Sequence, residues 1–133
     1  MIGNCGVNKI GEEILGMSNL TTLMLRGNRF FSSIPDEIFA LTKLTSLNLK
    51  ECSLQDQIPS GIVQLTDLEV LDISVNSLRA PLPQGLTVLP GLRRLVAGQN
   101  PWSTTLPTWF SQLTALEQLY LGTSVLTLFP MVL

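Results

Sequence analysis

The sequence predicts an α/β solenoid, a short curved arc with parallel strands on its concave face and helical or 3-10 turns on its convex face. Leucine is in large excess, with 26 in a chain of 133 residues, and its positions recur at a spacing of 24 residues. Within each unit, two apolar residues flank one variable residue, as on one face of a strand. A unit this short cannot bury its apolar face alone, so consecutive units must stack around a shared core.

Three apolar columns define the predicted strands. The first is Leu20, Leu44, Leu68, Leu92 and Leu116; the second is Leu23, Leu47, Leu71, Leu95 and Leu119; the third is Leu25, Leu49, Ile73, Ala97 and Leu121. Because successive strand side chains point to opposite faces, the second and third columns point inward together, and the residues around them point outward.

A polar column follows each strand, and a proline follows the loop. The polar column is Asn28, Cys52, Asn76 and Asn100. An asparagine amide both donates and accepts hydrogen bonds, so these residues are predicted to form a ladder that satisfies turn backbone groups. Another apolar column comes next, and Leu126 is predicted to belong to it. Pro35, Pro59, Pro83 and Pro107 are then predicted at the first position of each helical turn.

The combined motif is L-x-x-L-x-L-x-x-N-x-L, by which the chain resembles the leucine-rich repeat family. The following Ile/Leu-Pro step resembles the plant-type subclass, although Ser32, Asp56, Ala80 and Thr104 stand where that subclass has glycine. The resemblance implies a leucine-rich-repeat solenoid, and cysteine is a common family substitute in the asparagine column. It also implies a non-enzymatic module that binds a protein partner through its concave face.

The repeats predict one domain over residues 1–133. It consists of a partial repeat at 1–19, repeats that start at 20, 44, 68 and 92, and an incomplete repeat at 116–133. Both ends fall in mid-repeat, and solenoids need covered ends. Three explanations stay open: a fragment of a longer array, a subunit whose ends are covered by neighbours, or an apolar tail at 125–133 that folds back as a cap.

The outward strand positions are the candidate recognition surface, because their chemistry varies while the apolar columns do not. The candidates are Thr22, Met24, Arg26, Asn48, Lys50, Asp72, Arg94, Val96 and Tyr120. Arg26 beside Lys50 predicts a small basic spot with Asp72 nearby. Tyr120, Met24 and Arg94 are residue types that anchor protein interfaces. The alternative is that all nine are ordinary solvated strand residues.

Composition argues against several other functions. The net charge of −2 disfavours a nucleic-acid groove, and the absence of histidine excludes His-dependent triads and His-ligated metal sites. No phosphate-binding loop or nucleophile elbow is present, and no apolar run is long enough to cross a membrane. We therefore expect a non-enzyme with no cofactor, no metal and no membrane span. The alternatives to a concave-face binder are a scaffold subunit in a larger assembly and a receptor-like fragment that senses a peptide or glycan.

Two features bear on the cellular compartment, and they point in opposite directions. Cys5 and Cys52 lie two coils apart, roughly 10 Å at the usual strand spacing, beyond the 7 Å or so that a disulfide spans between Cα atoms. Both are predicted to be free thiols, which favours a reducing, intracellular compartment. Asn19-Leu20-Thr21 is a glycosylation sequon, which matters only in a secretory compartment, so an extracellular location stays open.

Overall fold

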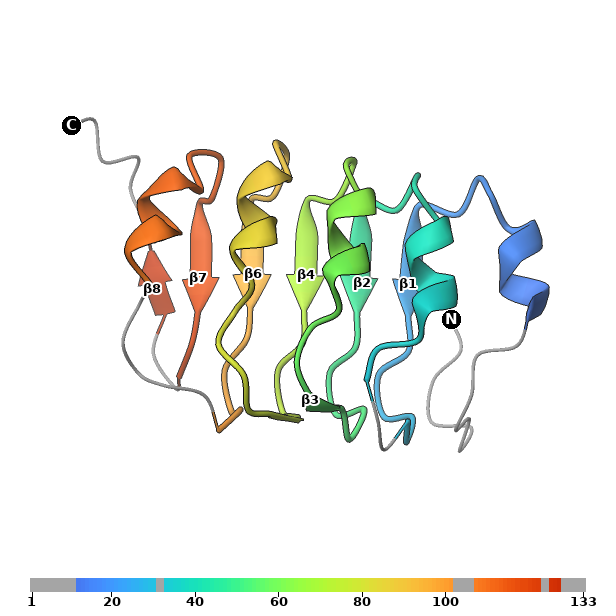
Figure 1. Ribbon diagram of the computed structural model, residues 1–133, viewed down its shortest axis with the longest axis horizontal. Helices are drawn as coiled ribbons and strands as arrows, with labels where there is room; N and C mark the ends of the chain where they lie inside the picture. Colours follow the sequence, from blue (N-terminus) through green and yellow to red (C-terminus); the bar gives the residue numbers. More distant parts are fainter. Residues whose placement is uncertain (1–11, 31–32, 102–106, 123–124, 128–133) are drawn as a thin grey trace.

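The computed structural model describes residues 12–30, 33–101, 107–122 and 125–127. Figure 1 shows a row of coils in which the strands form one face and the short helices form the other. The main sheet has the order β1-β2-β4-β6-β7-β8 within these residues. The predicted solenoid, with a parallel sheet on one side and 3-10 turns on the other, is confirmed.

The strands repeat the 24-residue step of the sequence. They are β1 (Thr22–Met24), β2 (Ser46–Asn48), β4 (Val70–Asp72), β6 (Arg94–Val96) and β7 (Gln118–Tyr120). Neighbouring strands run parallel, and each residue lies opposite the one 24 positions later, such as Leu23 opposite Leu47. The second leucine column is therefore a ladder across the sheet, and Leu47, Leu71 and Leu95 are 0% exposed at its centre.

The last strand breaks this pattern. β8 (Val125–Thr127) pairs antiparallel with β7, and Leu126 lies opposite Leu119. The alignment that placed Leu126 in the apolar column of the loop is therefore wrong. The reason is that the backbone reverses direction between β7 and β8, so the 24-residue step no longer describes its path. Part of the apolar tail thus pairs with the edge of the sheet.

Five 3-10 helices line the convex side of the described chain. They are η1 (Glu12–Gly16), η2 (Asp36–Ala40), η3 (Ser60–Gln64), η4 (Gln84–Val88) and η5 (Thr108–Gln112). The prolines were predicted at the first helical position, but each of them occupies the cap position before it. Pro35, for example, has an extended ψ of 132° and accepts the first bond of the turn, from Ile38 N–H at 3.2 Å. Proline fixes only φ, at a value that extended and helical backbone share, so both positions suit it.

A second, smaller sheet joins two loops and was not predicted from the sequence. β3 (Gln55–Asp56) pairs parallel with β5 (Ser77–Leu78), and Figure 1 shows β3 beyond the ends of the main strands. We call that side of the solenoid the exit edge and the opposite side, where the main strands begin, the start edge.

On the convex side, successive helices interlock through glycines. A Cβ added to Gly61 of η3 would lie 2.8 Å from Cγ of Phe39 in η2, and one added to Gly85 of η4 would lie 2.8 Å from Cγ1 of Val63 in η3. Phe39 is itself buried, at 2% exposure. Each glycine thus provides the space that the preceding helix fills. No helix among the described residues has the length and apolar character needed to cross a membrane.

Candidate functional site on the concave face

The nine predicted surface residues lie on or just beyond the main strands. Met24 and Arg94 are exposed, as are Thr22 and Arg26; the half-buried members are Asn48, Lys50, Asp72, Val96 and Tyr120. Their strands carry them in register, so Met24, Asn48, Asp72, Val96 and Tyr120 form one continuous row across the sheet. The structure thus brings the candidates together on one face.

The expected basic spot also contains an acidic residue, Glu51, which was not predicted from the sequence. Glu51 Oε1 lies 3.4 Å from Arg26 Nη2 and 4.0 Å from Lys50 Nζ, so one carboxylate pairs with both cations. Glu51 adopts a left-handed backbone with φ of 56°. Its residue type did not indicate this conformation in the sequence. These exposed pairs contribute little stability, but they lower the local positive charge.

Among the described residues, Asp72 forms no ion pair with Arg26 or Lys50, and it belongs instead to a polar network at the centre of the sheet. Its Oδ1 accepts hydrogen bonds from the Ser74 backbone N–H at 3.0 Å and the Ser74 hydroxyl at 2.6 Å. Its Oδ2 accepts a long bond from Asn48 Nδ2 at 3.5 Å, and Asn48 Oδ1 in turn accepts from Lys50 N–H at 3.0 Å. Asn48 and Asp72 therefore hold the strand ends as well as facing solvent, and their side chains are fixed.

Arg94 and Tyr120 form a stacked pair on β6 and β7. The guanidinium carbon of Arg94 lies 5.2 Å from the centre of the Tyr120 ring, within the range of a cation–π contact. The neighbouring Arg93 turns away and lies 3.7 Å from Glu117, as strand alternation requires. Arg94 therefore keeps N–H donors for a partner, while Tyr120 provides an aromatic surface that is already ordered.

The asparagine column underlies this face. Asn76 Oδ1 accepts from the backbone N–H groups of Cys52 and Leu54, both at 3.0 Å, and Nδ2 donates to the carbonyls of Leu49, Ile73 and Ser74 at 2.9 to 3.1 Å. Asn100 repeats this one coil later: its Nδ2 donates to the carbonyls of Ile73, Ala97 and Gly98, and its Oδ1 accepts from Leu78 N–H. Asn28 Nδ2 donates to Leu25 O at 2.8 Å. Each amide joins its own coil to the preceding one wherever both are described.

Cys52 fills the same column with different chemistry. Its thiol donates to Leu25 O at 3.1 Å and to Lys50 O at 3.5 Å, the carbonyls that match two acceptors of Asn76. A thiol has no carbonyl oxygen to offer, and the backbone carbonyl of Cys52 instead accepts from Phe30 N–H at 3.0 Å. Cys52 is a free, buried thiol, and Cys5 lies outside the described residues.

Burial raises the pKa of the Cys52 thiol from 9.0 to about 11, because the thiolate would lose its solvation. Above pH 9 the unfolded thiol ionises while the folded thiol keeps its proton, so the free energy of unfolding should fall between pH 9 and pH 11. Comparison of urea unfolding at several pH values with the Cys52→Ser variant, which has no thiol to ionise here, isolates this contribution. Peptide mapping after iodoacetamide treatment should also show Cys52 labelled only in urea, and rapid labelling of the folded chain would contradict its burial.

An open groove, which was not predicted from the sequence, continues the concave face at the exit edge. Its volume is about 550 Å³, and it is lined by Glu51, Ser53, Gln55, Val75, Asn76, Ser77 and Gln99. Glu51, Ser53, Val75 and Gln99 all have φ near +55°, a conformation that is costly for β-branched Val75. Because Asn76 is committed to the ladder, the groups left for a ligand are hydroxyls, neutral amides and the paired Glu51 carboxylate.

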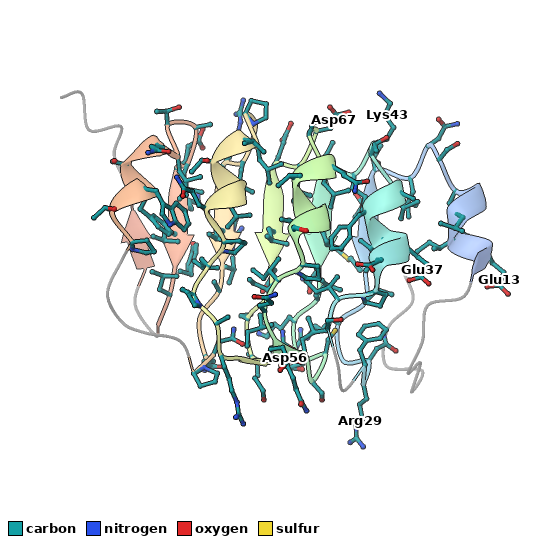
Figure 2. All side chains as sticks on the ribbon, in the orientation of Figure 1. Glu13, Arg29, Glu37, Lys43, Asp56 and Asp67 are labelled. Atoms are coloured by element: carbon teal, nitrogen blue, oxygen red, sulfur yellow. The ribbon has the colours of Figure 1, made fainter. Side chains whose placement is uncertain are left out.

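Several other charged residues lie apart from this face. Figure 2 shows Asp67 with Lys43 at the start edge, Asp56 at the exit edge and Glu37 on the helical side. Asp67 Oδ2 lies 3.7 Å from Lys43 Nζ. Among the described residues, no three His, Cys, Asp or Glu side chains are placed to hold a metal ion. Asn19 is exposed in the turn before β1.

Comparisons with known proteins agree with this fold. The family model for the leucine rich repeat matches residues 18–78, and no curated protein matches the chain. Among solved structures, the Arabidopsis receptor kinase HAESA ectodomain, in complex with an IDA peptide hormone, superposes with a TM-score of 0.73 at 30% identity, over 82% of this chain and 18% of that one. The Arabidopsis thaliana BIR3–SERK2 complex gives 0.73 at 33% identity, over 84% and 61%. A plant ice-binding protein gives 0.64 at 32% identity, over 78% and 34%.

The extent of these matches limits what they say of a whole protein. The chain spans less than a fifth of the HAESA ectodomain and about three fifths of the chain matched in the BIR3–SERK2 structure. The repeat motif matched in the sequence nevertheless agrees with two features of the structure, the parallel sheet and the asparagine ladder. Residues 18–78 match the leucine rich repeat family, and the fold of the described chain is that of a leucine-rich-repeat solenoid.

Proposed function

We propose that the chain is a non-enzymatic binding module that takes an extended segment of a protein partner on its concave face. The observation that carries the proposal is the arrangement of this face before any partner is present. The Asn48–Asp72–Ser74 network and the Arg94–Tyr120 stack fix their side chains on a rigid sheet. A surface that is already ordered loses little conformational entropy on binding.

The chemistry of the face suits a peptide chain. Tyr120 with Val96 offers apolar and aromatic surface, and the Arg94 guanidinium offers donors to a carbonyl or carboxylate of the partner. The groove at the exit edge adds the Ser53 and Ser77 hydroxyls and the Gln99 amide, which can bond a peptide backbone of any sequence. Specificity would then come from the varied row on the strands.

The related structures support the same class of ligand. The HAESA ectodomain was solved with a peptide hormone, and the BIR3 structure was solved as a complex with SERK2. Both structures therefore hold a similar repeat chain in complex with a peptide or a protein.

Replacing Arg94 and Tyr120 together by alanine should weaken peptide binding while the fold persists. A randomised peptide-display library selected on the intact chain supplies the probe, and fluorescence anisotropy measures its affinity. We expect the affinity to fall by at least about tenfold, because aromatic and arginine anchors carry about 2 kcal/mol or more each at interfaces. Both side chains reach solvent, so the urea unfolding midpoint should change little.

A convex-face variant is the matched control. Gln64 on η3 and Val88 on η4 are both exposed, and Val88 reaches 57%. The Gln64→Ala/Val88→Ala variant should bind the selected peptide as well as the original chain. Unchanged affinity in the Arg94/Tyr120 variant, or a larger loss in the convex variant, would rule out the concave face as the binding surface.

A further inference from the structure

We propose that Asn19 is an acceptor site for N-linked glycosylation. The tripeptide Asn19-Leu20-Thr21 has the required Asn-x-Thr form with a permitted middle residue. The structure places Asn19 in the turn between η1 and β1, and both Asn19 and Thr21 are exposed. This inference stands apart from the proposed binding function, since neither depends on the other.

The middle residue keeps both flanking side chains on the solvent side. Leu20 is half-buried against the core, and its backbone N–H donates to Met17 O at 2.9 Å. The backbone carbonyl of Thr21 is held by the next coil, since it accepts from Thr45 N–H at 2.8 Å and from the Thr45 hydroxyl at 3.1 Å. Among the described residues, no hydrogen bond engages the Asn19 amide or the Thr21 hydroxyl. The two groups that the modification requires are therefore free in the folded chain.

The position also lets the folded solenoid carry a glycan. Asn19 belongs to the same repeat column as Lys43 and Asp67, 24 and 48 residues later. Figure 2 shows Lys43 and Asp67 projecting from the start edge of the solenoid. A glycan in this column would extend into solvent from the start edge, away from the row of Asn48, Asp72 and Tyr120. Neither the core nor the convex interlock would have to change.

The reaction needs a lipid pyrophosphate-linked oligosaccharide as its glycosyl donor. The amide nitrogen of Asn19 forms a bond to the anomeric carbon of the first sugar, and the bond from that carbon to the pyrophosphate oxygen breaks. The amide nitrogen loses one proton, and the lipid pyrophosphate leaves as the second product. The Thr21 hydroxyl is part of the acceptor that the transferring enzyme recognises, which is why threonine or serine must stand there.

The test directs the full chain into a eukaryotic secretory pathway behind an added, cleavable secretion signal. Intact mass spectrometry of both retained and secreted protein should show an added oligosaccharide that peptide N-glycosidase removes. That enzyme converts the acceptor asparagine to aspartate, so peptide sequencing should locate aspartate at position 19. An unmodified chain in both fractions would overturn the proposal, as would a glycan on any other asparagine.

Variants of the tripeptide separate the sequon from a general change in the turn. Asn19→Gln and Thr21→Ala should both abolish the modification, and Thr21→Ser should retain it. The glycosylated and unmodified chains should have the same urea unfolding midpoint, because the glycan projects from an exposed turn. A lowered midpoint of the glycosylated chain would show that the folded solenoid does not accommodate it, against the proposal.

Discussion

Replacing Asn76 by alanine should lower the free energy of unfolding by about 4 kcal/mol, because each buried polar group left without a hydrogen-bond partner costs about 1 to 3 kcal/mol. The Asn76 amide makes five hydrogen bonds to backbone groups in two adjacent coils. Alanine would leave the N–H groups of Cys52 and Leu54 without this acceptor and remove a donor from three carbonyls. Asn76 also lies in the middle of the array, where a defect separates the coils on either side.

Urea unfolding measures the global loss, and hydrogen exchange of the Cys52 and Leu54 amides measures the local one. Both amides should exchange much faster in the variant, since Asn76 Oδ1 is their acceptor. Asn76→Asp is the matched control: it keeps the acceptor oxygens but loses the donor, so these amides should stay more protected than in the alanine variant. A loss below about 1 kcal/mol, the net worth of one ordinary hydrogen bond, would show that the ladder is not a main source of stability.

The strands and the ladder could be predicted from the sequence because the fold repeats the spacing of the sequence. A step of 24 residues puts Leu23, Leu47 and Leu71 opposite one another, and burial of that row fixes which residues face outward. The same step places the polar column at equivalent turns, so the position of Asn76 followed from the pattern. Repetition thus supplies long-range information that a single strand does not carry.

The features that the sequence did not reveal depend on backbone conformation within the loops. Glu51, Val75 and Gln99 are left-handed like Gly27 in the same column, but glycine alone suggests that conformation from sequence. The left-handed turn brings Glu51 to Arg26 and Lys50. Glu51, Val75 and Gln99 also line the groove at the exit edge. β8 was missed for a related reason, since its direction follows from a reversal of the chain and not from the repeat.

Replacing Gly61 by alanine should destabilise the chain by about 2 kcal/mol, the usual scale for an overpacked core. The new methyl group would lie 2.8 Å from Cγ and 2.9 Å from Cε2 of Phe39, too close for carbon atoms that are not bonded. Phe39 is 2% exposed, so its ring has little room to rotate away. In an unstrained position the same substitution is stabilising, by roughly 0.4 to 1 kcal/mol. The sign of the effect therefore depends on the ring.

A double-mutant cycle with Phe39 identifies that cause. Phe39→Ala alone should cost about 3 to 5 kcal/mol through the cavity it leaves, but it removes the atoms that would meet the new methyl group. In that background, Gly61→Ala should be neutral or slightly stabilising, so the two substitutions should couple by about 1 to 3 kcal/mol. Gly16→Ala in η1 is the control, since no atom lies within 4 Å of its added Cβ. If Gly61→Ala costs as much without the ring as with it, the penalty comes from the backbone of η3, and the convex interlock does not set the spacing of the helices.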